Sequence, residues 1–354
     1  MRNNFGLLRV LFASAVLITH AHVLSGDPGG DLLQRATDNQ AAFSWLAVRA
    51  FFVISGFLVY KSFERSSDVV DFLRRRFRRV WPALIALVLV TVFVIGPIFT
   101  YHNATHYFGK GATWRYAAMP ITIVLGQVPY DLPGVFDKVP HPGIVNGSLW
   151  TIAYEVLFYL ATAALFVLKR WSTALRATVL IVFLACMVVR MSVDGGILQL
   201  SGGLPFMAFT WWSIVDMGVF YSAGCVMASG PVLAHASMKS LLGLALVFLV
   251  LTIWLKVYPL AEGVLLPLLV ISAAYAPIRS GVRSGPVDIS YGTYLWGYPI
   301  QQMLMTAHAW TPLELAALSV PLAWAAGWLS WRMVERHFLV DHRLEPVRVD
   351  SPQP

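Results

Sequence analysis

The chain has 354 residues, of which 58% are hydrophobic and only 12% are charged, and its mean hydropathy is +0.67. Soluble globular proteins carry about 25% charged residues, so this composition excludes a soluble protein with an ordinary polar surface and favours a membrane protein. The net charge of +8 would suit nucleic-acid binding, but in a membrane protein an excess of Lys and Arg more often reports topology and contact with anionic lipids.

Apolar runs of about 20 residues, the length of a membrane-spanning helix, recur along the whole chain. Gly, Pro or charged residues separate nearly all of them, and the weakest boundary is Tyr258-Pro259. The segment 117–128 is apolar but too short to span, so we interpret it as re-entrant or interfacial. The sequence therefore predicts an all-α integral membrane protein, a bundle of about ten transmembrane helices at 5–25, 43–63, 80–100, 148–168, 176–194, 207–228, 239–258, 260–278, 288–307 and 313–334.

The distribution of Lys and Arg predicts how these helices are oriented. With the N-terminus inside, 19 of the 26 Lys and Arg lie in cytoplasmic segments, and shifting the count by one helix removes this bias. We therefore expect both termini in the cytoplasm. Residues 1–340 are predicted to form one membrane domain and 341–354 a short cytoplasmic tail. The outer loop 101–147, with its His, Tyr, Trp, Gly and Pro, is expected to be an ordered lid.

The first apolar run superficially resembles a signal peptide, because basic residues stand at its start. It contains Arg9, His20 and His22, and no convincing small-residue cleavage site follows it. We interpret it as a retained first helix.

The two cysteines, Cys186 and Cys225, both stand in apolar runs. The sequence has no CxxC pair and no His/Cys spacing typical of a metal site, so we expect neither a disulfide framework nor a bound metal. Both cysteines are interpreted as small buried hydrophobic residues.

Charged and titratable side chains inside a membrane are costly and often mark function. In the first helix, eleven positions separate Arg9 from His20. At about 100° per residue, both side chains lie within about 20° of one face and about 16 Å apart along the axis. A lone membrane His is more often a packed, hydrogen-bonded residue than a catalyst, but the Arg on the same face makes the two interpretations about equal.

A second feature is the predicted inner loop Phe72–Pro82, in which five of six consecutive positions are arginine. One interpretation is a stop-transfer anchor that contacts anionic headgroups, and the other is a site for a cytoplasmic polyphosphate, because Arg matches phosphate oxygens. So short a patch without a recognition fold makes nucleic acid an unsuitable partner. The arginines are Arg74, Arg75, Arg76, Arg78 and Arg79.

Three further charges lie in apolar surroundings. Glu155 stands about two turns into the fourth predicted helix and needs a partner, which could be a buried Arg, His20 or a substrate hydroxyl. Asp216 and Arg49 are better explained as members of structural ion pairs.

Taken together, these motifs resemble the acyltransferase-3 family of integral membrane acyltransferases, in the right order along nearly the whole chain. Each motif alone is weak evidence, whereas six in order on ten predicted helices are strong evidence. They are Arg9-x10-His20, Phe51–Leu58 (FFVISGFL), Arg75-x-x-Arg78 or Arg76-x-x-Arg79 followed by Trp81-Pro82, Ser148–Tyr159 with Glu155 as the acid, Ser290–Leu295 (SYGTYL), and Ser330-Trp331 with Glu335.

The resemblance has one departure. Many relatives have a His shortly after the SYxxYL motif, where this chain reads Trp296-Gly297-Tyr298-Pro299. Gly297 cannot do proton chemistry, so a catalytic role for that second His is absent here.

The resemblance implies transfer of an acyl group, commonly acetyl, from acyl-CoA to a hydroxyl of a cell-surface or exported polysaccharide or a lipid-linked sugar, by a multi-pass protein of the bacterial cytoplasmic membrane. His20 would deprotonate the acceptor or become transiently acylated, since His has a suitable pKa. Arg9 would contact the donor or stabilise charge on the thioester oxygen, and Glu155 would supply the acid. The arginine cluster would hold the CoA phosphates of acetyl-CoA, which acts as substrate rather than permanent cofactor.

Two other classes of function remain open from the residues alone. In a proton-coupled transporter or flippase of a glycan precursor, Arg9, His20 and Glu155 would form a proton relay, but paired broken helices and internal symmetry are not visible. Buried charges argue against a non-catalytic scaffold. The sequence does not specify the acceptor sugar, the acyl chain, covalent or direct transfer, the oligomeric state, or which arginine pair binds the donor.

Overall fold

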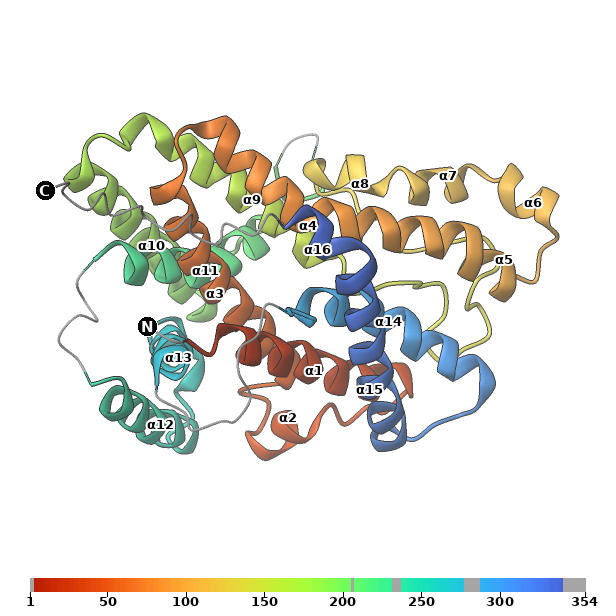
Figure 1. The fold of residues 1–354 in the computed structure, drawn as a ribbon. Coiled ribbons are helices and arrows are strands. Elements are labelled where there is room, and N and C mark those ends of the chain that lie inside the picture. Colours follow the sequence, from red (N-terminus) through yellow and green to blue (C-terminus); the bar gives the residue numbers. More distant parts are fainter. Residues whose placement is uncertain (1–2, 205–206, 231–236, 277–286, 340–354) are drawn as a thin grey trace, which may run out of the picture.

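The computed structural model describes residues 3–204, 207–230, 237–276 and 287–339, and these residues are almost entirely helical (Figure 1). Within them, β-structure is limited to two isolated bridges, Thr100 with Val135 and Gly203 with Thr210. The predicted tail 341–354 lies outside the described residues.

A helix overlaps each of the ten predicted spans. Gly, Pro and charged residues separate the apolar runs, and most of the helices end near these residues. The helices are α1 (Phe5–Leu24), α3 (Phe43–Arg65), α4 (Val69–Val90) continued by η1 (Thr91–Ile95) and α5 (Gly96–Phe99), α9 (Trp150–Ala164) continued by η3 (Leu165–Leu168), α10 (Ser172–Asp194), α11 (Trp211–Ser229), α12 (Met238–Trp254), α13 (Tyr258–Tyr275), α14 (Ser290–Ala307), and α15 (Pro312–Ser330) continued by η5 (Trp331–Glu335) and α16 (Arg336–Phe338).

Seven of these helices are long and apolar enough to cross a membrane. Of the other three, α12 has only 17 residues, whereas α11 and α14 are long enough but less hydropathic. The structure therefore supports an all-α membrane protein, while the number of ten spans and the orientation of both termini remain predictions.

The arginine cluster lies on a helix, so its assignment to a loop was wrong. Helix α4 begins at Val69. The side chain of the preceding residue, Asp68, accepts a hydrogen bond from the backbone N–H of Asp71. This side chain caps the free N–H groups of the first turn, and arginine itself is a good helix former. The helical segment continues for 31 residues to Phe99, about 46 Å at 1.5 Å per residue, which is longer than a bilayer core. The arginines therefore occupy its N-terminal turns.

The boundary between α12 and α13 lies earlier than the sequence predicted. Helix α12 ends at Trp254, and Lys256 takes a left-handed backbone conformation with φ of 59°. That conformation cannot continue a right-handed helix. Helix α13 then starts at Tyr258, with Pro259 in its first turn, where a missing N–H costs nothing.

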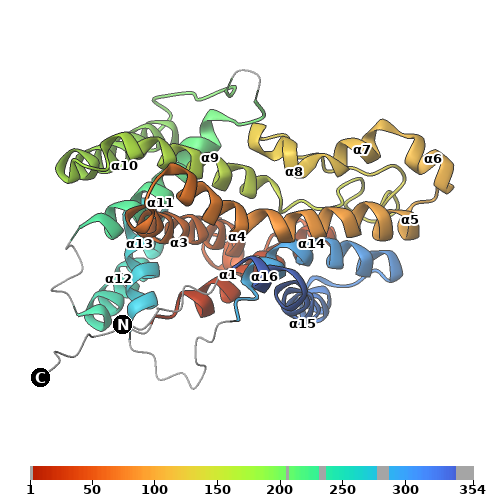
Figure 2. The ribbon, with the colours of Figure 1, turned by 45° about the horizontal axis from the view of Figure 1, so that its top comes forward.

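Glycines set the closest helix contacts. A Cβ on Gly56 of α3 would lie 1.9 Å from the carbonyl oxygen of Tyr221, and one on Gly224 of α11 would lie 2.2 Å from that of Val53. Helices α3 and α11 therefore approach to backbone contact, as small residues allow in membrane helix pairs. Helix α1 packs against α3, α14 and α15. As a result α1, α3 and α14 form the centre of the molecule, with α10 to α13 on one side of them (Figures 1 and 2).

The long outer segment returns along α4. It contains α6 (Ala104–Gly109), α7 (Gly111–Ala117), α8 (Met119–Thr122) and η2 (Ile123–Leu125), which form a row beside α4 and α5 (Figures 1 and 2). The Tyr107 hydroxyl donates to the Val92 carbonyl at 3.0 Å, and Trp81 Nε1 donates to the Pro120 carbonyl at 2.8 Å. The chain thus runs back toward the arginine end of α4, and the interpretation of 117–128 as re-entrant or interfacial stays a prediction.

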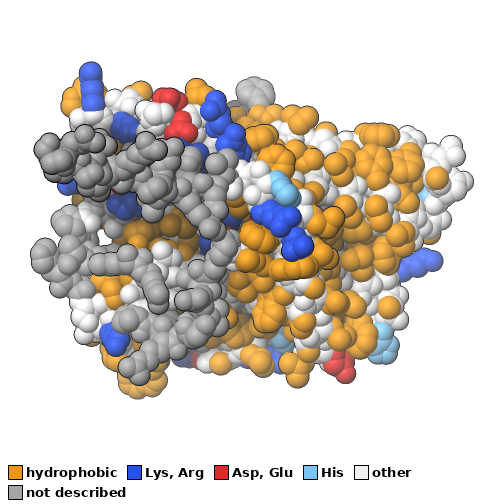
Figure 3. All heavy atoms as spheres, in the orientation of Figure 1, with side chains coloured by type: hydrophobic (Ala, Val, Ile, Leu, Met, Phe, Trp, Pro, Cys, Tyr) orange, Lys and Arg blue, Asp and Glu red, His pale blue; other side chains and the backbone are white. Residues whose placement is uncertain are grey.

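Much of the outer surface is hydrophobic. Large apolar side chains are exposed along α15, and the face shown in Figure 3 is covered by hydrophobic side chains over α14 and α15 with few charges among them. Such a surface is suited to lipid contact and unsuited to water. The exposed residues of α15, η5 and α16 include Leu313, Leu318, Leu322, Trp324, Trp328, Leu329, Met333 and Phe338.

Candidate functional site

A cavity lies between α1, α3, α4, α9 and α14. It encloses about 840 Å³ between its walls, part of which is open to the outside. Four charged side chains line it: Arg9 from α1, Arg76 and Arg79 from α4, and Glu155 from α9. The remaining wall is apolar or carries hydroxyl groups, a combination typical of ligand sites of this size. The structure therefore brings together four residues that the sequence predicted as site residues.

Asp288, immediately before α14, holds two of these arginines. Its Oδ2 atom forms an ion pair with Arg9 at 3.0 Å and accepts a hydrogen bond from Arg79 at 2.7 Å. Its Oδ1 atom accepts from both the backbone N–H and the hydroxyl of Ser290. Sequence analysis did not single out Asp288. The only available signal was an acid two residues before the SYGTYL segment.

Glu155 is fixed by hydroxyl groups. Its Oε1 atom accepts from the Ser55 hydroxyl of α3 at 3.1 Å and from the Tyr159 hydroxyl one turn further along α9. Ser55 belongs to the FFVISGFL segment, so two of the motif segments meet here. Of the partners that the sequence left open for Glu155, His20 makes no hydrogen bond to it, and the arginines share its cavity.

A second, basic cleft adjoins the cavity. It encloses about 870 Å³ and is lined by six cationic side chains, together with Phe338 and Leu339. Arg76, Arg79 and Leu58 line both spaces, so these residues form the boundary between them. The cationic residues of the cleft are Lys61, Arg65, Arg75, Arg76, Arg78 and Arg79.

The other arginines of the cluster differ in their surroundings. Arg75 forms an ion pair with Asp71 one turn earlier in α4, at 3.0 Å, and Arg76 donates to the Ser62 hydroxyl at 3.0 Å. Arg74 is exposed and lines neither space. Four of the five predicted arginines therefore line the basic cleft, and Arg74 lies outside it.

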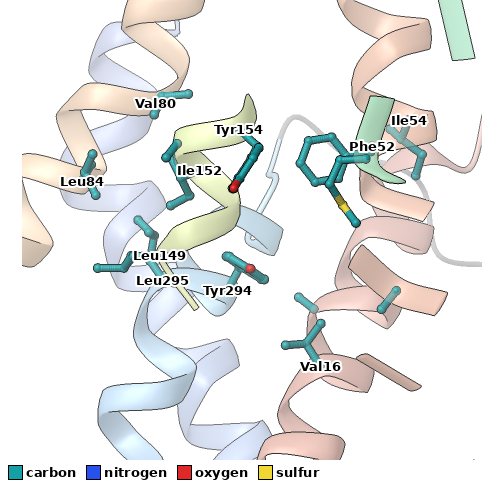
Figure 4. Packing of buried hydrophobic residues seen from close by; sticks show 14 of the residues in the cluster. Val16, Phe52, Ile54, Val80, Leu84, Leu149, Ile152, Tyr154, Tyr294 and Leu295 are labelled. Atoms are coloured by element: carbon teal, nitrogen blue, oxygen red, sulfur yellow. The ribbon is translucent and has the colours of Figure 1, made fainter. Parts of the chain in front are cut away.

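His20 does not line the cavity. Its ring is 5.1 Å from that of Tyr298, edge to face, and its Nδ1 atom is buried with no hydrogen-bond partner among the described residues. Tyr298 is one helical turn, about 6 Å, beyond Tyr294, which lines the cavity. Figure 4 shows Tyr294 pointing from α14 toward α1 and α3.

A loop segment covers the region around His20. The side-chain amide of Gln302 donates to the carbonyls of His141 and Ile144, at 3.0 and 2.7 Å. Asn146 donates to the Leu295 carbonyl at 2.9 Å. These bonds pin residues 141–146 against α14, with His141 near enough to His20 for their charges to interact.

His22, by contrast, has a hydrogen-bond partner. Its Nδ1 atom lies 2.9 Å from Asp27, which also binds Arg35. Hydrogen bonds from the backbone of Gly29 and from the His22 side chain lower the pKa of Asp27 to about 2, so this carboxyl is ionised at neutral pH. Of the two histidines in α1, only His20 has a buried ring nitrogen that is left without a partner.

A separate charged group, here called the paired network, lies among α3, α10, α11 and α13. Arg49 contacts Asp216 at 3.2 Å and Glu262 at 2.7 Å, and Arg190 contacts the same acids at 3.1 and 3.0 Å. The predicted structural ion pair of Arg49 and Asp216 is confirmed. Sequence analysis missed Arg190 and Glu262, although each is a charge inside an apolar run.

Within the described residues, no group of three or more His, Cys, Asp and Glu side chains is arranged to hold a metal ion. Both cysteines are free thiols, buried in Cys225 and half-buried in Cys186.

Comparison with known proteins shows the family to which the site belongs. The sequence model of the acyltransferase-3 family, described as an acyltransferase domain, matches residues 2–331. The chain belongs to the acyltransferase-3 family. The match covers α1 with Arg9 and His20, every residue that lines the cavity and the cationic residues of the basic cleft, so the resemblance predicted from the motifs is confirmed.

Three relatives agree with this membership. The chain is 28% identical to the O-acetyl transferase of Shigella phage Sf6 over 95% of its own length and 96% of that protein. It is 32% identical to Nodulation protein 10 of Rhizobium leguminosarum bv. viciae, over 52% of this chain and 49% of that protein. It is 33% identical to Acyltransferase MdmB of Streptomyces mycarofaciens, over 32% and 26% of the two chains. No solved structure matches the chain.

As a member of the acyltransferase-3 family related along its length to an O-acetyl transferase, the chain is an enzyme of the O-acetyltransferase class, and its apolar helices make it a multi-pass membrane protein.

Proposed function

We propose that this enzyme moves an acetyl group from acetyl-CoA to a hydroxyl of a cell-surface or exported polysaccharide, or of a lipid-linked sugar, across the bacterial cytoplasmic membrane. The observation that carries the proposal is the pair of adjoining spaces, a basic cleft that meets, at Arg76 and Arg79, a cavity lined also by Arg9 and Glu155. A molecule with phosphates at one end and a reactive thioester at the other matches this succession.

The basic cleft would hold the phosphates of the donor. Guanidinium groups match phosphate oxygens in charge and geometry. The N-terminal turns of α4, which carry Arg75 and Arg78, would face the cytoplasm, where CoA is available. Arg76 and Arg79, which line both spaces, would contact the donor where it passes from the cleft into the cavity.

Inside the cavity, Arg9 would hold the donor arm. Because about 16 Å of helix separates Arg9 from His20, the two side chains act at different points of the donor. Of the two roles that the sequence left open for Arg9, donor contact therefore fits better than stabilising the thioester oxygen beside His20. Glu155, held by Ser55 and Tyr159, would stand opposite as a fixed acceptor of hydrogen bonds.

His20 would carry out the transfer itself. In the direct route, the acceptor hydroxyl gives its proton to His20, its oxygen bonds to the thioester carbonyl carbon, the C–S bond breaks, and the proton passes to the departing CoA sulfur. In the covalent route, an imidazole nitrogen bonds to the thioester carbonyl carbon, the C–S bond breaks, and the imidazole proton passes to the departing CoA sulfur. The acceptor oxygen then bonds to the acyl carbon, the C–N bond breaks, and the hydroxyl proton returns to the imidazole. The unpartnered Nδ1 atom is compatible with either route.

Labelled acetyl-CoA supplied to membranes that contain the enzyme and its native glycan tests this proposal. Loss of the base should reduce acetyl incorporation by about 100-fold or more in His20→Ala, and loss of a donor contact should reduce it in Arg9→Ala. His22→Ala, in the same helix and engaged with Asp27, is the matched control and should retain transfer. Full incorporation by His20→Ala would show that the proposed chemistry is wrong.

The acceptor can be identified without assuming a sugar. Comparing the O-acetyl NMR signals of surface polysaccharide from a deletion strain and its parent should show which signals require the enzyme. Unchanged signals in every surface glycan would contradict the proposed acceptor class.

A further inference from the structure

We infer that Asp288 is a positioning residue for the donor, which holds Arg9 and Arg79 at fixed places on the cavity wall so that a bound thioester is directed toward His20. The inference rests on the proposed donor site and adds a residue that neither the motifs nor the relatives indicate. It follows from the hydrogen-bond arrangement around this one carboxylate.

Every side of the Asp288 carboxylate is occupied. One oxygen accepts from the backbone and hydroxyl of Ser290, which fixes the carboxylate to the first residue of α14. The other oxygen forms ion pairs with Arg9 of α1 and Arg79 of α4, and Arg79 also donates a hydrogen bond to it. Three helices are thus joined at a single group, and the two guanidiniums meet at one oxygen. Charged bonds of this kind hold geometry better than neutral ones.

Asp288 itself does not line the cavity, whereas Arg9, Arg79 and Ser290 all do. Its side chain is only 17% exposed. It therefore acts through the arginines rather than on the donor.

The charges determine what its loss would do. One carboxylate paired with two guanidiniums leaves an excess of one positive charge at the wall, so an anionic donor is still attracted. If the carboxylate becomes an amide, the two guanidiniums repel each other, and nothing holds them at their present places. Both remain cationic, and a competing anion is gone, so donor affinity persists while its alignment is lost.

This separation of affinity from alignment gives the test. Asp288→Asn should lower the rate at saturating acetyl-CoA by between about 10-fold and 100-fold, the effect of misplacing reacting groups by about 1 Å. The Kd of CoA for the purified full chain should stay the same or fall. Asp288→Glu, which keeps the charge, should restore part of the rate. Asp38→Asn, which removes the exposed ion pair with Lys256, is the matched control and should change neither quantity.

A double variant excludes a purely structural role. If Asp288 acts through Arg9, then Arg9→Lys combined with Asp288→Asn should be no slower than the slower of the two single variants. If the double variant is slower by the product of the two single losses, the inference is overturned. It is also overturned if the Asp288→Asn rate is within about twofold of wild type, or if the Kd of CoA rises by as much as the rate falls. If Asp288→Asn fails to fold, the same two measurements on Asp288→Glu test the inference: its transfer rate should fall while its Kd for CoA does not rise. A wild-type enzyme that transfers no acetyl overturns the proposed function instead.

Discussion

Two groups of charged side chains lie among the helices, and they differ in a way that burial alone does not show. In the paired network, two arginines face two acids, and every charge has a partner of opposite sign. In the cavity, three arginines face Glu155 and the adjacent Asp288, and both spaces are open to a ligand. The Arg49 and Arg9 side chains are similarly exposed, at 17% and 21%.

The difference teaches how to assign buried charge. A group with balanced charge and no adjoining cavity is expected to serve folding, whereas a group with excess charge that lines a cavity is expected to bind a ligand of the opposite charge. Mutations in a group of the first kind should lower the stability of the enzyme. Mutations in a group of the second kind should change donor binding or acetyl transfer.

The largest expected effect is in the paired network. Glu262→Ala removes one of the two acids that pair with both Arg49 and Arg190, so two buried positive charges are left facing Asp216 alone. Breaking a buried pair in this way costs about 3–5 kcal/mol, so the yield of folded enzyme and its thermal stability should fall sharply. Lys256→Ala, which breaks only an exposed pair with Asp38, should cost about 0–1 kcal/mol. Equal stability of the two variants in a thermal unfolding assay would remove the distinction.

A smaller effect is expected at Glu155. Tyr159→Phe removes a hydroxyl that donates to this carboxylate but keeps the ring in the cavity wall. A hydrogen bond to a charged group contributes about 1.5–3 kcal/mol, so acetyl transfer should fall about tenfold or more.

The matched control is Tyr221→Phe, which removes a buried hydroxyl bonded to Thr162 outside the cavity. It should lower stability by about 1 kcal/mol and leave transfer unchanged. If Tyr221→Phe slows transfer as much as Tyr159→Phe, the rate loss reports packing rather than the cavity.

Hydropathy predicted most of the fold because apolar runs and their Gly and Pro breaks are local features. It failed where local signals conflict: the arginines of α4 looked like a loop because they are charged, although Asp68 caps a helix there. Periodicity placed Arg9 and His20 on one face of α1 but could not say what lies opposite each of them.

The partners of the charged residues are the part that the sequence could not supply. Asp288 contacts Arg79 across 209 positions, and Arg49 contacts Glu262 across 213. Such contacts depend on how distant helices pack, and a single sequence holds no local pattern for them. A lone charge in an apolar run, such as Arg190 or Glu262, indicates that a partner exists without naming it.

The most direct measurement is the Kd of CoA for the purified full chain at low and high salt, in wild type and in Arg75→Ala combined with Arg78→Ala. If the basic cleft binds the donor phosphates, the double variant should bind about tenfold more weakly, or by about 1.4 kcal/mol, and its binding should depend less on salt. Arg74→Ala, outside both spaces on the same helix, should behave as wild type. A double variant with wild-type affinity and salt dependence would contradict a donor site in the cleft.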